Sequence, residues 1–594
     1  MTTLKKKKMF IPKKEDKNLG TRQLVVGVCF SVLFAIIAGR AAYLQIFKNQ
    51  WLAQKAREQY NKTMVSCGKR GTIYDAKNQE LAVSLAGHSL GAFPTRMSDK
   101  KDVAHKLAKI LRLNPGALHK KLKDATAFIW VKRKITPKEM AEIKKLGIQG
   151  LEFVAEHDRF YPNRGLAAHV IGFTDTDGKG IEGVEFQYDK DLYSAPDKLM
   201  VVRDARGRRF NAADGYNQAT QGNNVVLTID RQIQYLAEKT LNEAASEFEA
   251  RYGTALVMDP KTGAILAMAQ YPGFNPNSFT KYNKDLWRNR AITDPYEPGS
   301  TLKVVLAAAA LESQMITPNT SFYCENGSYR VGGNRVNDTH PYEWLTVQQI
   351  IKYSSNIGAV KISEIIGKTM LYESLVNFGF GRLSGIDCPG ESSGILSNCK
   401  RWRPIDTGAI SFGQGVSVTA VQLLTAISAI ANGGELMKPH IVKAVTAPDG
   451  TLVRNCEIQN PKRVISRETA EKVKSMMATV VDDGGTGMNA ALSKYTVCGK
   501  TGTAQKIDPK GGYSADKYNS SFVGFAPKAD PRVAVLVILD EPKKAHYGGT
   551  VAAPAFRKIT HETLNYLNVE PENDNNEETI LLAQRFETKR EEKR

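Results

Sequence analysis

Three short motifs in this sequence hold hydroxyl, amine and amide groups that could together carry out acyl transfer: Ser-x-x-Lys, Ser-x-Asn and Lys-Thr-Gly. A serine hydroxyl becomes an effective nucleophile when a neighbouring base takes its proton, and a lysine amine serves as that base once its pKa is lowered. Each motif alone is weak, because the chain contains six Ser-x-x-Lys and two Lys-Thr-Gly matches. The sequence around each match must decide which of them could do chemistry.

Ser300 is the Ser-x-x-Lys serine that opens a strong helical pattern. It follows the chain-breaking Glu297-Pro298-Gly299, and an apolar, alanine-rich run follows Lys303. Residues i and i+3 share a helix face, so we expect the Lys303 amine to reach the Ser300 hydroxyl. The helix dipole and the apolar neighbours both disfavour the ammonium form and lower the lysine pKa. The pattern predicts a nucleophile and its base, whereas a capping serine beside a solvated lysine is the alternative.

The other two motifs fall at the ends of predicted elements. Ser354-Ser355-Asn356 lies between two helical runs, where a hydroxyl can pass a proton and an amide can both donate to and accept from a peptide bond. Lys500-Thr501-Gly502-Thr503 caps a strand predicted at 495–498. Its lysine and two hydroxyls suit a carboxylate, and Gly502 lets a ligand approach the backbone closely. Simple turn chemistry is the alternative for either motif alone.

Two competing interpretations of the Lys-Thr-Gly sequences can be set aside. Lys261-Thr262-Gly263 comes before the predicted nucleophile and follows Asp259-Pro260, which predicts a hairpin turn. Gly499-Lys500-Thr501 could suggest a phosphate-binding loop, but that motif requires glycine at position 494, where this chain has lysine.

The composition is that of an ordinary globular protein with one apolar segment near its start. The chain has 594 residues, 42% of them hydrophobic and 24% charged, and a net charge of +21. These values exclude a mostly disordered, collagen-like or polytopic membrane protein. The basic charge suggests an anionic partner such as nucleic acid, a membrane surface or a wall polymer, but no groove-reading or aromatic-basic motif supports nucleic acid.

Residues 1–22 form a basic tail with eight basic and two acidic side chains, and an uncharged run covers 23–39. The apolar character resumes beyond Arg40, so we predict a single transmembrane anchor over 23–47. The positive-inside rule puts the tail in the cytoplasm and everything after the anchor on the other side of the membrane. A cleaved signal peptide is the alternative, but no convincing cleavage site precedes a polar start.

The rest of the chain divides into two predicted domains and a tail. Residues 48–222 mix short strands with a basic helical stretch at 102–123 and a second helix that begins at the capping pattern Thr136-Pro137-Lys138-Glu139. In 223–570, strands come first, helix-like runs fill most of 300–432, and strands return before a last helix at 552–567. This order predicts an α/β fold with helices on the faces of a sheet. Residues 571–594 are predicted to be disordered or a solvated helix.

The cysteines and histidines predict no metal site and no cofactor. The seven cysteines form no Cys-x-x-Cys motif and no dense even framework, and the nine histidines are scattered. Cys388 and Cys399 bracket a loop and could pair in an oxidising compartment, although two free thiols are favoured.

The motifs occur in the order found in serine β-lactamases and penicillin-binding proteins, with Ser355 in the variable middle place. The sequence resembles the class B penicillin-binding proteins, and among them the FtsI-like septal peptidoglycan D,D-transpeptidases. Further resemblances lie at Arg70-Gly71-Thr72-Ile73-Tyr74-Asp75, Arg159-Phe160-Tyr161-Pro162, Ala168-His169-Val170-Ile171-Gly172, Gly180-Ile181-Glu182-Gly183-Val184-Glu185, Ser411-Phe412-Gly413-Gln414-Gly415 and Ser521-Phe522-Val523-Gly524-Phe525. One departure is Ala76-Lys77-Asn78, where the family usually has Asp-Arg-x-Gly.

The resemblance implies a mixed α+β architecture: one transmembrane helix, a pedestal or dimerisation-like domain, and a transpeptidase domain with a central antiparallel sheet flanked by helices. It also implies residue roles. Ser300 would attack the D-Ala-D-Ala carbonyl with Lys303 as base, and Ser354 would relay a proton while Asn356 holds the peptide amide. Lys500, Thr501, Gly502 and Thr503 would bind the terminal carboxylate, and the backbone N–H groups of Ser300 and Thr503 would form the oxyanion hole.

The resemblance further implies peptidoglycan stem peptides and β-lactams as ligands, a SEDS-family polymerase of the FtsW type and other divisome membrane proteins as partners, and a place in the bacterial inner membrane. Four alternatives stay open: an elongation-type transpeptidase, a D,D-carboxypeptidase, a β-lactamase-like hydrolase, and a catalytically silent divisome scaffold. A bifunctional synthase is disfavoured because residues 48–222 resemble the pedestal and not a glycosyltransferase.

Overall fold

The structure, a computed structural model, describes residues 17–52, 55, 61–66, 69–193, 197–203, 209–210, 221–456, 460–508 and 511–572. The chain separates into two compact units: Met1–Ser66 with Pro196–Gln218, and Cys67–Ala195 with Ala219–Arg594. Residues 1–16 of the predicted cytoplasmic tail and residues 573–594 of the predicted C-terminal tail lie outside the described residues.

The first unit contains a long apolar helix. Helix α1 (Lys17–Ala42) continues into a π-helical turn, η1 (Tyr43–Phe47). The span Arg22–Phe47 has 26 residues, and an 18-residue window within it has a mean hydropathy of 2.3 with no buried residue. At 1.5 Å per residue the span is about 39 Å long, enough to cross a hydrocarbon core of about 30 Å. The anchor predicted over 23–47 therefore coincides with a helix of the right length and composition. The unit also holds a small sheet of β1 (Asn61–Ser66), β6 (Asp197–Arg203) and β7 (Arg209–Phe210).

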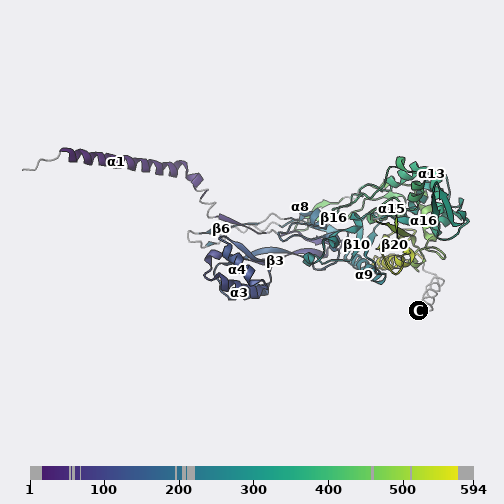
Figure 1. Ribbon diagram of the computed structural model, residues 1–594, viewed down its shortest axis with the longest axis horizontal. Coiled ribbons are helices and arrows are strands. Elements are labelled where there is room, and N and C mark those ends of the chain that lie inside the picture. The colour runs from purple at the N-terminus through teal and green to yellow at the C-terminus, as the bar shows by residue number, and fades with distance from the viewer. Residues whose placement is uncertain are drawn as a thin grey trace, which may run out of the picture. The chain divides into compact units, whose positions relative to one another are not determined.

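The N-terminal part of the second unit is built on a long two-stranded ribbon. Strand β3 (Glu80–Ala92) pairs along most of its length with β5 (Leu151–Phe160), and at one end also with β4 (Ile129–Ile135). Helices α3 (Lys100–Leu111) and α4 (Pro115–Asp124) lie side by side at that end of β3, and α5 (Pro137–Lys145) packs near them (Figure 1). Three short helices follow: α6 (Ala168–Ile171), α7 (Gly183–Gln187) and α8 (Asp189–Leu192).

Of the two helices predicted for this part, one is divided in two and the other begins as expected. The basic stretch expected at 102–123 is two helices, because Arg112 is left-handed with φ 55° and Asn114 caps a new helix whose first residue is Pro115. The capping box predicted at Thr136 is confirmed: its side chain accepts from the Glu139 N–H, and the Glu139 carboxylate accepts from the Thr136 N–H.

A seven-stranded sheet joins this part to the C-terminal part of the chain. Its order is β17-β16-β8-β2-β3-β4, with β5 pairing β3. The new members are β2 (Ile73–Tyr74), β8 (Asn224–Leu227), β16 (Val442–Thr446) and β17 (Leu452–Asn455). Strand β8 follows directly on the predicted boundary at 222 and pairs with β2 in parallel and with β16 antiparallel.

A buried ion-pair cluster stabilises the base of the ribbon. The two oxygens of Glu185 accept from Arg70 and Arg159, each at 2.6 Å, and all three side chains are buried. Burial alone would raise the pKa of Glu185, but the two guanidinium groups hold it below its ordinary value. Each of the three residues comes from a different pedestal-like motif of the sequence, so the cluster explains why those motifs occur together.

The C-terminal part is built on a five-stranded antiparallel sheet in the order β10-β9-β21-β20-β19. Its strands are β9 (Tyr252–Met258), β10 (Ile265–Tyr271), β19 (Cys498–Ile507), β20 (Tyr513–Ala526) and β21 (Val533–Asp540). The hairpin turn predicted at Lys261 is confirmed, with Gly263 at φ 78° between β9 and β10. The order brings β9 and β21, the first and last strands of this sheet along the chain, side by side, which the sequence does not show.

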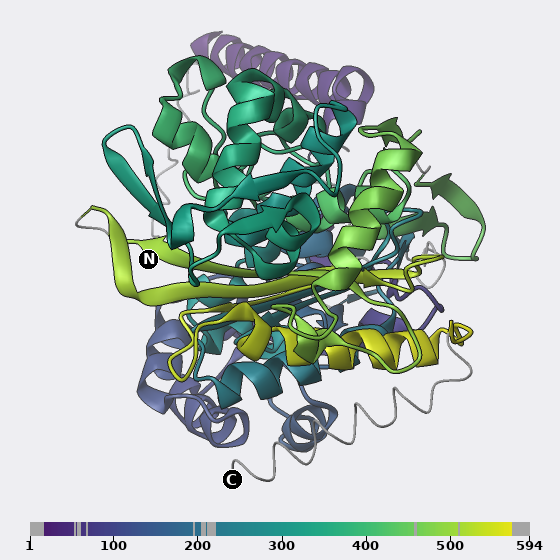
Figure 2. The same cartoon turned by 90° about the vertical axis from the view of Figure 1, so that its right-hand side faces the viewer.

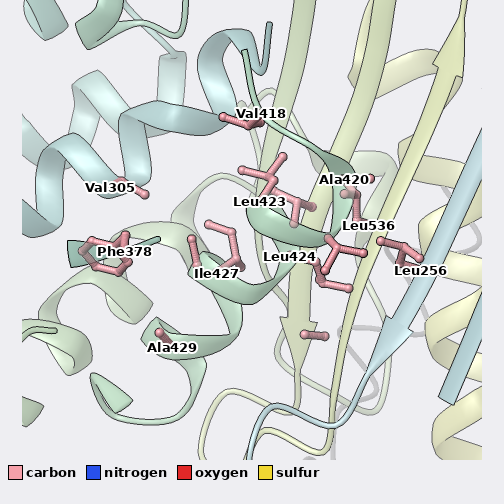
Figure 3. Packing of buried hydrophobic residues seen from close by; sticks show 14 of the residues in the cluster. Leu256, Val305, Phe378, Val418, Ala420, Leu423, Leu424, Ile427, Ala429 and Leu536 are labelled. Carbon is pink, nitrogen blue, oxygen red and sulfur yellow. The ribbon is translucent and has the colours of Figure 1, made fainter. Parts of the chain in front are cut away.

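Helices cover both faces of this sheet (Figure 2). Helices α9 (Arg231–Glu247) and α18 (Ala553–Tyr566) pack on one face, and the second confirms the helix predicted at 552–567. The central helix of the other face is α15 (Ala420–Ala431), in which every residue is buried. Figure 3 shows Leu423, Leu424 and Ile427 of α15 between Val305 on one side and the strand residues Leu256 and Leu536 on the other. The main core thus lies between this helical layer and the sheet.

The remaining helices belong mainly to the α15 side: α10 (Arg290–Thr293), α11 (Lys303–Glu312), α12 (Val347–Tyr353), α13 (Asn356–Asn377), α14 (Pro404–Ser411), α16 (Arg467–Thr479) and α17 (Gly548–Val551). Small two-stranded sheets interrupt the region predicted as helix-like, made of β11 (Ser321–Tyr323) with β14 (Trp344–Thr346) and β12 (Ser328–Val331) with β13 (Asn334–Asn337). Strand β15 (Glu435–Leu436) pairs with β18 (Lys462–Arg463). Cys388 and Cys399 are both free thiols.

Replacing Glu185 by Gln should destabilise the protein by about 3–5 kcal/mol, because the buried Arg159 would lose its carboxylate and Arg70 would keep only Asp189. The matched control is Asp102→Asn, which removes an exposed Lys106–Asp102 pair and should change the stability by less than about 1 kcal/mol. Denaturant unfolding of the purified chain would measure both. Equal effects of the two substitutions would contradict a stabilising role for the cluster.

Candidate active site

Ser300 lies in a tight turn that leads into the central helical layer. The turn is a 3-10 helix, Gly299–Leu302, and α11 begins only at Lys303, so the α-helix expected to start at Ser300 starts one turn later. Gly299 is left-handed with φ 57°, and a Cβ there would lie 3.2 Å from the Ala504 side chain. The Ser300 hydroxyl is half-buried and makes no hydrogen bond to another residue in the described part of the chain, so the contact with the Lys303 amine expected from the spacing is not formed. A small residue at 299 thus lets the turn approach β19 closely.

Lys303 is fully buried, and its amine contacts the second motif. Its Nζ is 2.6 Å from the Ser354 carbonyl oxygen, 2.8 Å from Asn356 Oδ1 and 3.3 Å from Ser354 Oγ. Burial lowers the pKa of Lys303 to about 7, although the Asp338 carboxylate opposes the shift. Near neutral pH a substantial fraction of Lys303 is therefore the neutral amine that a general base must be.

Ser354 occupies the turn between α12 and α13, as the sequence predicts. It is left-handed with φ 63°, an uncommon backbone conformation for a residue other than glycine. Both its carbonyl oxygen and its Oγ contact the Lys303 amine. Ser355 caps α13 and accepts from the Gly358 N–H at 2.9 Å. The middle residue of the motif is therefore structural, while the outer two face the lysine.

Asp338 holds this turn in place, and sequence reasoning missed it. Its Oδ1 accepts from the backbone N–H groups of Asn356 at 2.5 Å and Ile357 at 3.0 Å, and its Oδ2 accepts from the Ser355 hydroxyl at 2.5 Å. The carboxylate sits at the N-terminus of α13, where the helix dipole favours a negative charge. Strand β14 and helix α12 separate Asp338 from the motif, and no local pattern marks this residue, so only the tertiary contact identifies it.

Lys500 approaches the same hydroxyl from the sheet. It is fully buried, and its Nζ is 2.9 Å from Ser354 Oγ and 3.3 Å from Thr501 Oγ1. Burial, reinforced by the charge of Lys303, holds the pKa of Lys500 well below its ordinary value. Ser354 Oγ thus bridges two amines that cannot easily both be charged. A hydroxyl that can donate and accept is suited to pass a proton between them.

The Lys-Thr-Gly-Thr motif is part of a strand and not a cap on one. The strand expected at 495–498 contributes only Cys498, because β19 begins there and runs through the motif to Ile507. Strand β19 is an edge strand of its sheet and pairs with β20 on one side. A Cβ at Gly502 would come within 2.3 Å of Ser521 Oγ and 2.9 Å of Thr301 Cγ2. Glycine there allows the nucleophile turn and the sheet to touch.

The hydroxyls of this motif are anchored to neighbouring loops. Thr501 Oγ1 donates to Thr486 Oγ1 at 3.0 Å, and Thr503 Oγ1 accepts from the Gly548 N–H at 3.1 Å. The three motifs, which are far apart in the sequence, therefore meet at one place between the helical layer and the edge strand β19. In the part of the chain that the structure describes, no three His, Cys, Asp or Glu side chains are grouped to hold a metal ion.

Comparison with known proteins shows the family of the chain. The sequence model of the penicillin-binding protein transpeptidase domain matches residues 253–561, and that of the penicillin-binding protein dimerisation domain matches 66–227. The chain belongs to the class B penicillin-binding proteins. The family assignment, the mixed α+β fold and the serine transpeptidase class expected from the sequence are thereby confirmed.

Several curated relatives match nearly the whole chain of this penicillin-binding protein. The probable peptidoglycan D,D-transpeptidase PenA of Neisseria gonorrhoeae is 36% identical over 550 residues, which is 92% of each chain. Stage V sporulation protein D of Bacillus subtilis is 33% identical and covers 93% of this chain and 86% of its own. The peptidoglycan D,D-transpeptidase FtsI of Escherichia coli is 31% identical and covers 94% and 95%.

A solved structure has the same fold. Penicillin-binding protein 3 of Mycobacterium tuberculosis, complexed with aztreonam, superposes with a TM-score of 0.67 at 28% identity and covers 86% of this chain and 98% of its own. The transpeptidase domain implies a peptidoglycan substrate and β-lactam binding for this penicillin-binding protein.

Acylation by a penicillin should depend on pH through Lys303. Because the base must be neutral and its pKa is lowered to about 7, the second-order acylation rate should rise between pH 5.5 and 8 with an apparent pKa near 7. The value belongs to the coupled Lys303–Lys500 pair and not to one residue. Stopped-flow acylation with a fluorescent penicillin would measure it. A rate that is flat over this range would contradict the neutral-lysine base.

Asp338→Asn should shift this pH profile as well as slow acylation. The Asp338 carboxylate raises the pKa of Lys303, so its neutralisation should move the acidic limb of the profile to lower pH. The loosened turn should lower the plateau rate by about 10-fold or more, in line with the loss of hydrogen bonds to a charged group. The matched control is Glu325→Gln, which removes the partner of Lys361 and should leave the profile unmoved. A slower rate with an unshifted profile would leave Asp338 a purely structural role.

Proposed function

We propose that the chain cross-links peptidoglycan stem peptides through an acyl-enzyme on Ser300, with release of D-alanine. The observation that carries the proposal is the contact of one hydroxyl, Ser354 Oγ, with two fully buried lysine amines of depressed pKa, beside the turn that presents Ser300. Relatives named peptidoglycan D,D-transpeptidase support the same reaction.

In the first half-reaction, Ser300 Oγ attacks the carbonyl carbon of the penultimate D-Ala, and Lys303 takes the hydroxyl proton. The backbone N–H groups of Ser300 and Thr503 stabilise the oxyanion, an effect commonly worth about 10²–10³ in rate per donor. The C–N bond then breaks, and the leaving amine of D-alanine receives a proton through Ser354. Asn356 holds the peptide amide. Its Oδ1 contacts the Lys303 amine, and the Asp338 carboxylate fixes its position by accepting from its backbone N–H.

The terminal carboxylate of the donor binds along the edge strand β19. Lys500, Thr501 and Thr503 offer an amine and two hydroxyls along β19, and Gly502 between them keeps the backbone accessible. In the second half-reaction, the amine of a neighbouring stem attacks the acyl carbonyl, the ester bond to Ser300 breaks, and the serine regains a proton. A penicillin would acylate Ser300 in the same way and remain bound.

We further propose a septal role, with the domain division given by the sequence: a cytoplasmic tail 1–22, an anchor 23–47, a pedestal 48–222, a transpeptidase domain 223–570 and a tail 571–594. The apolar helix fits a single-pass inner-membrane protein. The basic tail supports a cytoplasmic N-terminus with the catalytic domain outside. A relative named FtsI supports the septal over the elongation type. A SEDS polymerase of the FtsW type is the partner that a septal role implies.

The deciding test is labelling with a fluorescent penicillin. Wild-type protein should form a stable adduct, and Ser300→Ala should form none, because the ester bond has no oxygen to form on. The matched control is Ser278→Ala, which removes the serine of another Ser-x-x-Lys sequence and should label normally. Labelling and release would be followed by gel fluorescence over several hours.

Each other result of this experiment excludes the proposal in a different way. An adduct on Ser300→Ala would place the nucleophile elsewhere. Rapid release of hydrolysed penicillin from the wild-type protein would indicate a β-lactamase-like hydrolase. A wild-type protein that never labels would indicate a catalytically silent scaffold.

A further inference from the structure

Residues 96–148, at the far end of the β3–β5 ribbon, carry a large share of the positive charge of the chain. They include fifteen Lys or Arg and five Asp or Glu side chains, a net charge of +10. Residues 1–22 account for another +6 of the total of +21, so the remaining 519 residues share only +5. We call residues 96–148 the head. The proposed chemistry uses no residue of the head, so it does not account for this charge.

The length of the ribbon separates the head from the part of the chain that contains the catalytic site. Ala82 of β3 pairs with Ile73 of β2, which joins the C-terminal part through β8, whereas Ala92 of β3 pairs with Ile129 of β4 in the head. The ten residues between these two pairs span about 33 Å at the rise of a strand. Figure 1 shows α3 and α4 at this end of β3. Charges are screened within about 8 Å at physiological salt, so the head cannot attract a substrate to Ser300.

The head has an apolar core of its own, which holds its two basic helices in place. Val103, Leu107 and Leu111 of α3 and Leu118 and Leu122 of α4 are buried in one hydrophobic cluster, separate from those of the C-terminal part. The side chains on the opposite sides of both helices are exposed. The head therefore presents its charges on a fixed surface and not on a loose loop.

The cations of the head fall into two groups. Those on strand β4, Lys132, Arg133 and Lys134, all form ion pairs with carboxylates. Six others, on α3, on α4 and in the turn between these helices, are exposed and form no ion pair with any described residue: Lys101, Lys109, Arg112, Lys120, Lys121 and Lys123. Like charges at this density repel one another, so an anionic partner would stabilise the surface that they form.

The type and spread of these cations favour a surface with many anionic groups over a single bound anion. Five of the six are lysines, whose ammonium groups are strongly hydrated point charges on flexible stems. They are distributed over helices of 12 and 10 residues, which are about 18 and 15 Å long. Clusters of about four to eight Lys or Arg near a transmembrane helix attract anionic phospholipids. The six cations fit this pattern.

The apolar helix Arg22–Phe47 keeps the head close to a membrane surface. Lys69, where the description of the second unit begins, comes 22 residues after Phe47, which corresponds to at most about 75 Å of extended chain. This reach exceeds the length of the ribbon, so the head can touch the membrane that the helix crosses. A tethered contact needs little intrinsic affinity, because the local concentration of the partner is high. An anionic wall polymer has compatible charge but no such tether.

We propose that the head binds the anionic phospholipid surface of the membrane in which the apolar helix lies, through the six exposed cations of α3, α4 and the turn between them. The contact is electrostatic, and it is separate from acyl transfer at Ser300. It therefore accounts for the share of the positive charge that neither the basic N-terminal tail nor the proposed reaction uses.

The test measures lysine acetylation in the full chain, reconstituted in lipid nanodiscs of neutral phosphatidylcholine or of the same lipid mixed with anionic phosphatidylglycerol. Acetylation of Lys101 and Lys123, followed by mass spectrometry, should be about fivefold slower in the anionic discs. This protection should disappear when the salt concentration rises from about 0.05 M to about 0.5 M, because salt screens exposed charges. Lys400, an exposed lysine of the transpeptidase domain, should react equally in both discs.

Two triple variants locate the contact. The first reverses three charges of the head and should abolish the protection: Lys109→Glu, Lys120→Glu and Lys121→Glu. The matched control reverses three exposed lysines outside the head and should retain the protection: Lys239→Glu, Lys443→Glu and Lys494→Glu. Both variants should label with a fluorescent penicillin as the wild-type protein does, which checks that they fold. If the first does not, glutamine at the same three positions removes the charges without reversing them, and it should still remove at least about half of the protection.

Three results would overturn the inference. Equal acetylation in neutral and anionic discs, or protection that survives high salt, would exclude an electrostatic contact with lipid. An equal loss of protection in both triple variants would show that the net charge of the whole chain is responsible and not the head. Stronger protection by purified peptidoglycan sacculi than by anionic discs at the same salt concentration would identify a wall polymer as the partner in place of the membrane.

Discussion

The hydroxyl of Ser354 lies between two buried lysine amines, and the rest of the site depends on this contact. Its Oγ is 3.3 Å from Lys303 Nζ and 2.9 Å from Lys500 Nζ. Burial away from water lowers the pKa of both lysines, and the charge of Lys303 lowers the pKa of Lys500 further. The fold thereby maintains a neutral amine near Ser300 at neutral pH, and a hydroxyl beside it that can accept or donate a proton.

The three motifs reach this point from three separate pieces of structure, so the surrounding packing must be rigid. Ser300 comes from a turn before α11, Ser354 from the turn between α12 and α13, and Lys500 from the edge strand β19. Helix α15, buried along its whole length, fills the space between the helices and the sheet (Figure 3). Glycines at 299 and 502 allow the turn and the strand to approach to distances that a side chain would block.

The residues that carry the chemistry could be predicted because each motif is local. A hydroxyl, an amine and a glycine at fixed spacing can be recognised in a few residues, and so can the capping box at Thr136. Asp338 could not be assigned in this way. Asp338 acts through backbone N–H groups on a helix that starts 18 residues later. This contact is not visible in the neighbouring sequence.

The sequence by itself determined the family, the nucleophile motif and the apolar anchor, because these depend on residue type, spacing and hydropathy over short stretches. Only the tertiary structure decided that Lys303 contacts the second motif, that Lys-Thr-Gly-Thr lies within an edge strand, and that β9 pairs with β21. The physical reason is that pKa shifts, strand pairing and close packing depend on which groups meet after folding. Two lysines are buried around one hydroxyl only when three distant segments come together, so no single segment predicts this arrangement.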